Sequence, residues 1–168
     1  SDFSMQAYST DSSIIYVVDD DQAVRESLKS LFDSVGLKSQ AFPSATDFLS
    51  AKLPDVASCL ILDVRLPGLG GLDFQDELAR AKIDIPIIFI TGYGDIPMSV
   101  KAMTGGAVEF LSKPVREQDL LDAVQLALNR AQRSGEADMQ LRDLRNRYEA
   151  LSAREKQIMS LVCAGLMN

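Results

Sequence analysis

The chain has 168 residues, of which 46% are apolar, and it carries a formal net charge of −7. It contains no histidine, which excludes histidine-based acid–base chemistry, histidine metal ligands and a phosphohistidine carrier role for this polypeptide. Residues 1–132 hold 11 Lys and Arg against 19 Asp and Glu, a net charge of −8, so this part is expected to repel nucleic acid, whereas residues 133–168 carry +1.

The first ten residues are largely polar and carry no basic segment, so no signal peptide is expected, and we expect residues 1–12 to be disordered. Residues 1–4 precede Met5 and resemble the remnant of an expression tag. No apolar run approaches the roughly 20 residues that a membrane helix needs, so no membrane partner is expected. Two isolated cysteines without C-x-x-C spacing favour a reducing, cytoplasmic location over a disulfide framework or a metal site.

Apolar runs alternate with amphipathic stretches between residues 13 and 132. The runs predict five strands, at residues 14–18, 38–42, 59–63, 85–91 and 107–111. A helix is expected after each strand. The first ends at Gly36, the second is capped by Ser44 with Asp47, the third carries Leu72, Phe74 and Leu78, the fourth begins at Pro97 and the fifth begins at Glu117. Strict alternation predicts an α/β fold of the flavodoxin-like (βα)5 type, with a five-stranded parallel sheet as the middle of three layers.

The sequence from Ser134 to Glu136 predicts a break after the last of these helices, so we assign residues 13–132 to the first domain and residues 133–150 to a helical linker. In the linker region, apolar residues are spaced by three and four, at Leu141, Leu144, Tyr148 and Leu151. This spacing is typical of a coiled coil, but it spans fewer than two heptads. We therefore prefer a linker helix that packs on its own domain.

Polar residues follow several of the predicted strands. Asp19 and Asp20 end the first strand, Asp63 ends the third, Thr91 ends the fourth, and the fifth runs out to Lys113. Ligands of open parallel sheets bind beyond the carboxyl ends of the strands, so these side chains are expected to point into one crevice. Taken singly, each has an ordinary structural explanation, such as a helix cap, a turn or a solvated loop. Their joint placement favours a site.

Clustered carboxylates raise one another's pKa unless a cation offsets the repulsion. Hard oxygen ligands suit Mg²⁺, which binds through one or two carboxylates and shares its coordination shell with a phosphate. Together with Lys113 and Thr91, these acids predict a receptor for a phosphoryl group, in which the central Asp63 is the nucleophile. Asp21, directly before the first helix, is instead expected to cap it.

Four segments resemble the motifs of response-regulator receiver domains. They are VVDDD (17–21), LILDVRLPGLGG (60–71), FITGYGD (89–95) and EFLSKPV (109–115), and the resemblance covers residues 13–132. It implies that Asp63 is the phosphoacceptor, and that Asp20 and Asp63 bind Mg²⁺ with the backbone carbonyl of Arg65 as a third protein ligand. It also implies that Asp19 reaches the metal mostly through water.

The same resemblance assigns roles around the phosphoryl group. Thr91 is implied to be the switch hydroxyl that moves toward the phosphate, and Lys113 to pair with the phosphate and to precede a cis peptide at Pro114. Phe110 is implied to be the aromatic switch residue, although an ordinary core aromatic would explain it as well. Phosphorylation is then expected to shift a two-state equilibrium in the face formed by the fourth helix and the fifth strand.

The C-terminal segment LSAREKQIMSLVCAGLMN resembles the opening of the LuxR-type helix-turn-helix domain found in FixJ-like regulators. Residues 151–168 are therefore expected to be the incomplete start of an all-α DNA-binding domain. The implied partners are a sensor histidine kinase, a second copy of the chain after phosphorylation, and promoter DNA for the complete protein but not for residues 1–168 alone. Because the product is the modified protein itself, we do not expect an enzyme.

Two other functions fit parts of the pattern. A receiver that signals only by protein contacts would share the whole site and lack a DNA output. A phosphohydrolase with an aspartyl nucleophile would share the Mg²⁺ and lysine chemistry. Such hydrolases usually carry a second acid two residues after the nucleophile, where this chain has Arg65, and this chain has no insertion long enough for a substrate cap.

Overall fold

The structure is a computed structural model, and it describes residues 13–92, 96–151 and 153–167. Within these residues the chain forms five strands and six helices, and it divides into two compact units, Ser1–Gln132 and Arg133–Asn168. The predictions made for residues 1–12 lie outside the described residues. In the part of the chain that is described, no helix combines the length and the apolar character required to cross a membrane.

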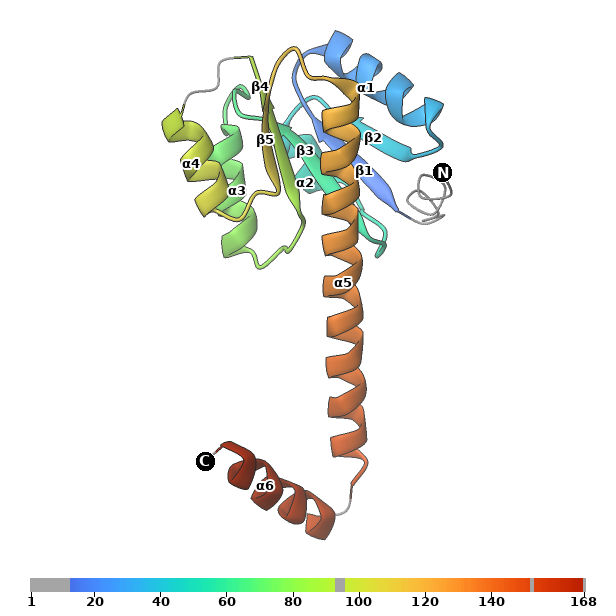
Figure 1. Ribbon diagram of the computed structural model, residues 1–168, viewed down its shortest axis with the longest axis vertical. Coiled ribbons are helices and arrows are strands. Elements are labelled where there is room, and N and C mark those ends of the chain that lie inside the picture. The colour runs from blue at the N-terminus through green and yellow to red at the C-terminus, as the bar shows by residue number, and fades with distance from the viewer. Residues whose placement is uncertain (1–12, 93–95, 152, 168) are drawn as a thin grey trace. The chain divides into compact units, whose positions relative to one another are not determined.

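The first unit is built on one parallel sheet (Figure 1). Its strands are β1 (Ile14–Val18), β2 (Lys38–Phe42), β3 (Ser58–Asp63), β4 (Ile87–Thr91) and β5 (Glu109–Ser112). The order across the sheet is β2-β1-β3-β4-β5, and each neighbouring pair runs parallel. The predicted flavodoxin-like α/β fold is confirmed. The order reverses between β1 and β3, where doubly wound sheets have their binding crevice.

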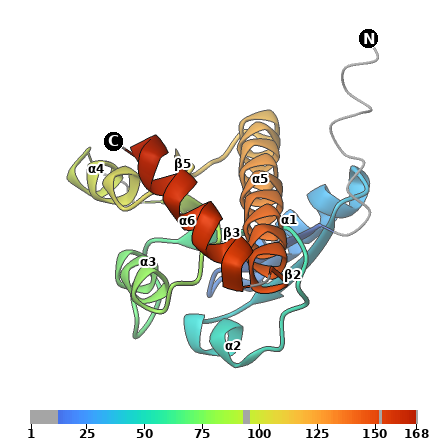
Figure 2. The same ribbon diagram turned by 90° about the horizontal axis from the view of Figure 1, so that it is seen from below.

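Helices cover both faces of the sheet (Figures 1 and 2). They are α1 (Gln22–Ser34), α2 (Ala45–Ser50), α3 (Gly71–Arg80), α4 (Ile96–Thr104) and α5 (Glu117–Glu149). Neighbouring residues of a strand point to opposite faces. Accordingly, Ile15 packs with Phe32 of α1 and Val124 of α5, whereas Tyr16 packs in the core that contains Phe48 of α2 and Phe74 of α3.

The predicted helix ends are confirmed by local hydrogen bonds. The carboxylate of Asp21 caps α1 by accepting the amide of Ala23 at 2.9 Å, and the hydroxyl of Ser44 caps α2 by accepting the amide of Asp47 at 3.1 Å. Gly36 follows α1 with a φ of 77°, which is the conformation that glycine adopts without a steric penalty.

Two strands begin later than the sequence predicted. β4 starts at Ile87, two residues after the predicted position. The intervening Pro86 has no backbone N–H to contribute to a ladder. β5 starts at Glu109 because the amide of Ala107 donates to the carbonyl of Ala102 and so closes the end of α4.

The predicted break at Ser134-Gly135-Glu136 is wrong, since α5 continues through it to Glu149. A single glycine in an exposed helix costs only about 1 kcal/mol relative to alanine, and the helix-forming residues around it outweigh that cost. In the second unit, α5 is followed by α6 (Ala153–Met167). Lys156 joins the two helices through an ion pair with Glu149 at 3.6 Å and a position 5.4 Å from the centre of the Tyr148 ring.

Apolar side chains of the second unit are exposed. Leu141 and Leu144 of α5 are 49% and 61% exposed, and Leu161 of α6 is 70% exposed. The predicted packing of the linker on its own domain stays a prediction. The cysteines expected to form no disulfide are free, Cys59 in the core of the first unit and Cys163 on the surface of α6. Burial raises the pKa of the Cys59 thiol to about 12.

Candidate functional site

The carboxyl ends of four strands lie at one edge of the sheet. Asp19 and Asp20 follow β1, Asp63 is the last residue of β3, Thr91 is the last residue of β4, and Lys113 follows β5. The register places Asp63 opposite Ile90 and Thr91 opposite Ser112, so the strands end side by side. The residues singled out from the sequence therefore share this edge.

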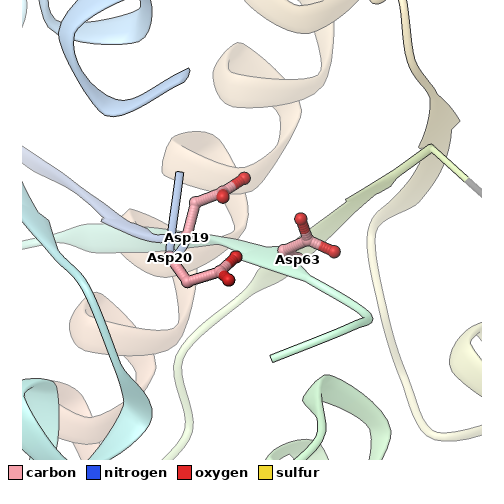
Figure 3. A group of neighbouring side chains, drawn as sticks. All are labelled: Asp19, Asp20 and Asp63. Carbon is pink, nitrogen blue, oxygen red and sulfur yellow. The ribbon is translucent and has the colours of Figure 1, made fainter. Parts of the chain in front are cut away.

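The carboxylates of Asp19, Asp20 and Asp63 form an acidic pocket (Figure 3). Each offers one oxygen, and these oxygens all lie within 4.8 Å of one another. Asp19 is fully buried and Asp63 is 7% exposed, whereas Asp20 is exposed to solvent. Carboxylate oxygens at this separation are a suitable donor set for a hard divalent cation, so the pocket fits a metal with oxygen preference.

Lys113 supplies the positive charge of the site. Its ammonium lies 3.0 Å from Oδ2 of Asp63 and 3.2 Å from Oδ2 of Asp19. The backbone supports this position, because the amide of Lys113 donates to the carbonyl of Thr91 at 2.8 Å. The peptide bond between Lys113 and Pro114 is cis, as predicted.

Backbone amides orient the acids. The amide of Arg65 donates to Oδ1 of Asp63 at 2.9 Å, and the amide of Asp21 donates to Oδ1 of Asp19 at 2.9 Å. The two oxygens of Asp63 thus have different partners, an amide on one side and the lysine on the other. Each carboxylate is thus held in place by the backbone amide two residues further along the chain.

The electrostatics of the pocket reflect burial and crowding. Burial raises the pKa of Asp19, and the nearby charge of Asp63 raises it further, while the Asp21 amide and Lys113 act against the shift. Burial opposes the charge of Lys113, but its contacts with Asp63 and Asp19 outweigh that effect, so the pKa of Lys113 is raised. The lysine is therefore cationic at neutral pH, and it offsets only part of the negative charge of the carboxylates.

A close backbone contact fixes the loop after Asp63. The amide of Gly71 donates to the carbonyl of Val64 at 2.9 Å. A Cβ atom at this position would collide with the carbonyl oxygen of Asp63. Only glycine allows α3 to begin this close to the end of β3, and this approach holds the loop that carries Arg65 beside the acids.

The remaining predicted residues lie around the pocket. Thr91 is fully buried at the end of β4. Phe110 is half-buried in β5, with its ring 6.2 Å from that of Phe89 on the neighbouring strand. The role of the Arg65 carbonyl as a metal ligand and the switch roles of Thr91 and Phe110 stay predictions.

One residue of the site was missed by the sequence analysis. The guanidinium of Arg25, on α1, donates to the backbone carbonyl of Asp19 at 2.8 Å. This bond ties α1 to the end of β1 and fixes the peptide that joins the two acids. The signal was an arginine six residues after Asp19, about one turn into the helix, from where it can reach back to the strand end.

A parallel α/β domain with an acidic pocket and a lysine at its strand ends is the arrangement of a receiver domain. Residues 15–125 match the model of the response regulator receiver domain family. The chain belongs to this family.

The relatives of the chain include a protein named as a transcriptional regulator. The chain is 59% identical over 155 residues to Nodulation protein W of Bradyrhizobium diazoefficiens, an alignment that covers 92% of this chain and 68% of that protein. It is 39% identical over 155 residues to the transcriptional regulatory protein FixJ of the same species, covering 92% and 75%. The solved structure of the response regulator StyR is similar, with a TM-score of 0.83 and 41% identity over 92% of this chain and 78% of that one.

Proposed function

We propose that the chain is the phosphoacceptor of a two-component system. In this proposal Asp63 takes a phosphoryl group from a sensor histidine kinase, and the modified protein changes conformation to control transcription. The observation that carries it is the contact of one lysine ammonium with both Asp63 and Asp19, 3.0 and 3.2 Å away, inside a pocket that fits a divalent cation.

The resident cation of the proposal is Mg²⁺, held by Asp20 and Asp63 with the backbone carbonyl of Arg65, and by Asp19 through water. When bound, it neutralises charge on the carboxylates and on the phosphoryl oxygens. An oxygen of Asp63 forms the new bond to phosphorus while the phosphorus–nitrogen bond of the kinase phosphohistidine breaks. The electron pair of that bond stays with the imidazole nitrogen.

Lys113 has two parts in this proposal. Before transfer its ammonium is paired with the carboxylates and holds them in a fixed arrangement. After transfer the phosphoryl oxygens carry more negative charge than the original carboxylate, so the ammonium and the hydroxyl of Thr91 are attracted to them. Movement of Thr91 and Phe110 then carries the change to the face formed by α4 and β5.

The output is proposed from the relatives. Residues 13–132 are the receiver, residues 133–150 a helical linker, and residues 151–168 the start of a LuxR-type helix-turn-helix domain. Phosphorylation promotes dimerisation, and the complete protein binds promoter DNA in the cytoplasm. The receiver modifies itself and turns over no separate substrate, so it is not classed as an enzyme.

Intact-mass spectrometry tests the central step. After incubation with acetyl phosphate and Mg²⁺, we expect a single phosphate adduct that is absent in Asp63→Asn and after chelation of the metal. Asp55→Asn, at an exposed acid outside the pocket, is the matched control and is expected to be modified like the parent. An adduct that survives Asp63→Asn would place the acceptor elsewhere and reject the proposal.

A further inference from the structure

The helix α4 is attached unevenly to the rest of the receiver. Of the α4 residues that the structure describes, only Ala102, in its C-terminal half, is buried. In the N-terminal half, Ile96 is 79% exposed, Val100 is 57% exposed, and Met98 is only partly buried against the core. The tight attachment of this helix thus lies near its C-terminal end.

A buried amide makes that attachment. Gln75 of α3 is 5% exposed, and its Nε2 donates to the carbonyl of Ala102 at 2.9 Å. The same carbonyl accepts the amide of Ala107 at 3.1 Å, which closes the end of α4. A buried side-chain amide that loses its partner is costly, so the bond strongly favours one position for this end of the helix.

The turn after α4 also packs closely against the side chain of Gln75. A Cβ atom added to Gly105 would lie 2.7 Å from Oε1 of Gln75 and 2.8 Å from its Nε2. Gly106, the next residue, has a φ of 97°, a conformation that favours glycine. The two glycines therefore let the turn after α4 lie directly against the amide, and Gln75 is held between this turn and its own helix.

Open space lies along the whole length of α4. A groove of about 680 Å³ separates α4 from Asp76 of α3, and it is lined from Ile96 at the start of α4 to Thr104 and Gly105 at its end. The groove alone therefore does not distinguish the two halves of the helix, but the contacts on the other side of the helix do. The N-terminal half contacts the core through the partly buried Met98, so it can shift against α3 with only a small loss of packing. The C-terminal half is held more strongly, because Ala102 is buried and its carbonyl accepts the Gln75 amide.

We propose that Gln75 is a positioning residue that fixes the C-terminal end of α4, so that the rearrangement of this helix on phosphorylation occurs in its N-terminal half. The proposal rests on the proposed function for its phosphorylation step. The amide acts through the carbonyl of Ala102 and does not touch the acidic pocket. It makes the end of α4 a fixed point about which the N-terminal half moves.

Backbone amide exchange, followed by nuclear magnetic resonance in the 168-residue chain, tests the anchor without any phosphate donor. Gln75→Met keeps the length of the side chain and removes its donor. We expect the amides of Gly105, Gly106 and Ala107 to exchange about tenfold faster in this variant. Asp76→Asn, at the exposed neighbour on α3, is the matched control and is expected to leave these rates unchanged. Rates within twofold of the parent in Gln75→Met would overturn the anchor.

The parent protein tests the pivot without a variant. With acetyl phosphate and Mg²⁺, the amide resonances of Met98, Ser99 and Val100 are expected to shift, while those of Gly105 to Ala107 stay in place. Equal shifts in both groups would overturn the pivot. Failure of the chain to take up phosphate would reject the proposed function, and the exchange experiment without donor would still decide whether Gln75 anchors α4.

Discussion

The ammonium of Lys113 lies 3.0 Å from Oδ2 of Asp63, which joins the residue after β5 to the last residue of β3. The same ammonium reaches Oδ2 of Asp19 at 3.2 Å, and Asp19 is fully buried. A buried carboxylate without a partner is unfavourable, so the pairing with Lys113 stabilises the arrangement of the two acids. The same ammonium is available to pair with a phosphoryl group.

Replacement of Lys113 should change Mg²⁺ affinity and the stability of the fold in opposite directions. In Lys113→Met the pocket is more negative, so Mg²⁺ should bind about two- to tenfold more tightly. Without Mg²⁺ the free energy of unfolding should fall by about 1–3 kcal/mol, because Asp19 loses its cation while the partly exposed site limits the loss. Mg²⁺ titration and urea denaturation measure both effects, with Lys101→Met on α4 as the control. Weaker Mg²⁺ binding in Lys113→Met would contradict this account of the pocket.

Asp20 and Asp21 are adjacent acids with different expected roles. Asp20→Ala should weaken Mg²⁺ binding by about tenfold or more, because it removes a carboxylate of the pocket. Asp21→Ala should leave Mg²⁺ binding nearly unchanged but lower the free energy of unfolding by about 1 kcal/mol, since it removes the cap of α1. Mg²⁺ titration and thermal unfolding of both variants measure these effects. Equal losses of affinity would show that the aspartates act only as a diffuse acidic patch.

The fold and the strand-end residues could be predicted because their signals are local. Apolar runs that end in Asp20, Asp63 and Thr91 identify strands and the edge at which their side chains gather. The pairing of Lys113 with Asp19 was not predicted, because it depends on which strands are neighbours across a chain separation of 94 residues. The sequence also suggested a break near Gly135, where the preferences of a whole helix outweigh one residue.

The hydroxyl of Thr91 should couple phosphorylation to the change of oligomeric state. Thr91→Ala keeps Asp63 and Lys113, so it should still take up phosphate from acetyl phosphate, but it should not dimerise in response. Thr91→Ser retains the hydroxyl and is expected to respond like the parent. Size-exclusion chromatography before and after phosphorylation distinguishes them. If Thr91→Ala dimerises as well as the parent, another residue provides the coupling.

Lys82 offers a site for stabilisation. It follows α3 with a φ of 58°. The amides of Lys82 and the next residue, Ile83, close the end of α3 with the same pattern of hydrogen bonds that the amides of Gly36 and Leu37 make after α1. A residue with a Cβ atom is disfavoured in this conformation, so Lys82→Gly should raise the free energy of unfolding by about 1 kcal/mol and the midpoint of thermal unfolding by about 2–4 °C. Gly36→Ala should act in the opposite direction. Calorimetry of both variants measures the effect, and a destabilised Lys82→Gly would contradict it.

DNA binding should require residues beyond the 168 of this chain. In a helix-turn-helix domain the second helix enters the major groove and contacts the bases, and residues 151–168 are proposed to form only the first helix. Non-specific binding should also be weak, because phosphate contacts depend on clustered cations and residues 133–168 carry a net charge of only +1 beside a receiver of −8.

A mobility-shift assay at physiological salt compares this chain with a longer chain that contains the complete proposed output domain. The longer chain should bind its promoter as a dimer after phosphorylation, and the 168-residue chain should give no sequence-specific complex. The exposed side chains of Ile158, Leu161 and Val162 on α6 should become protected from solvent in the longer chain, because the rest of the domain would pack on them. Specific binding by the 168 residues alone would refute the assignment of residues 151–168 and would place the DNA-reading surface elsewhere in the chain.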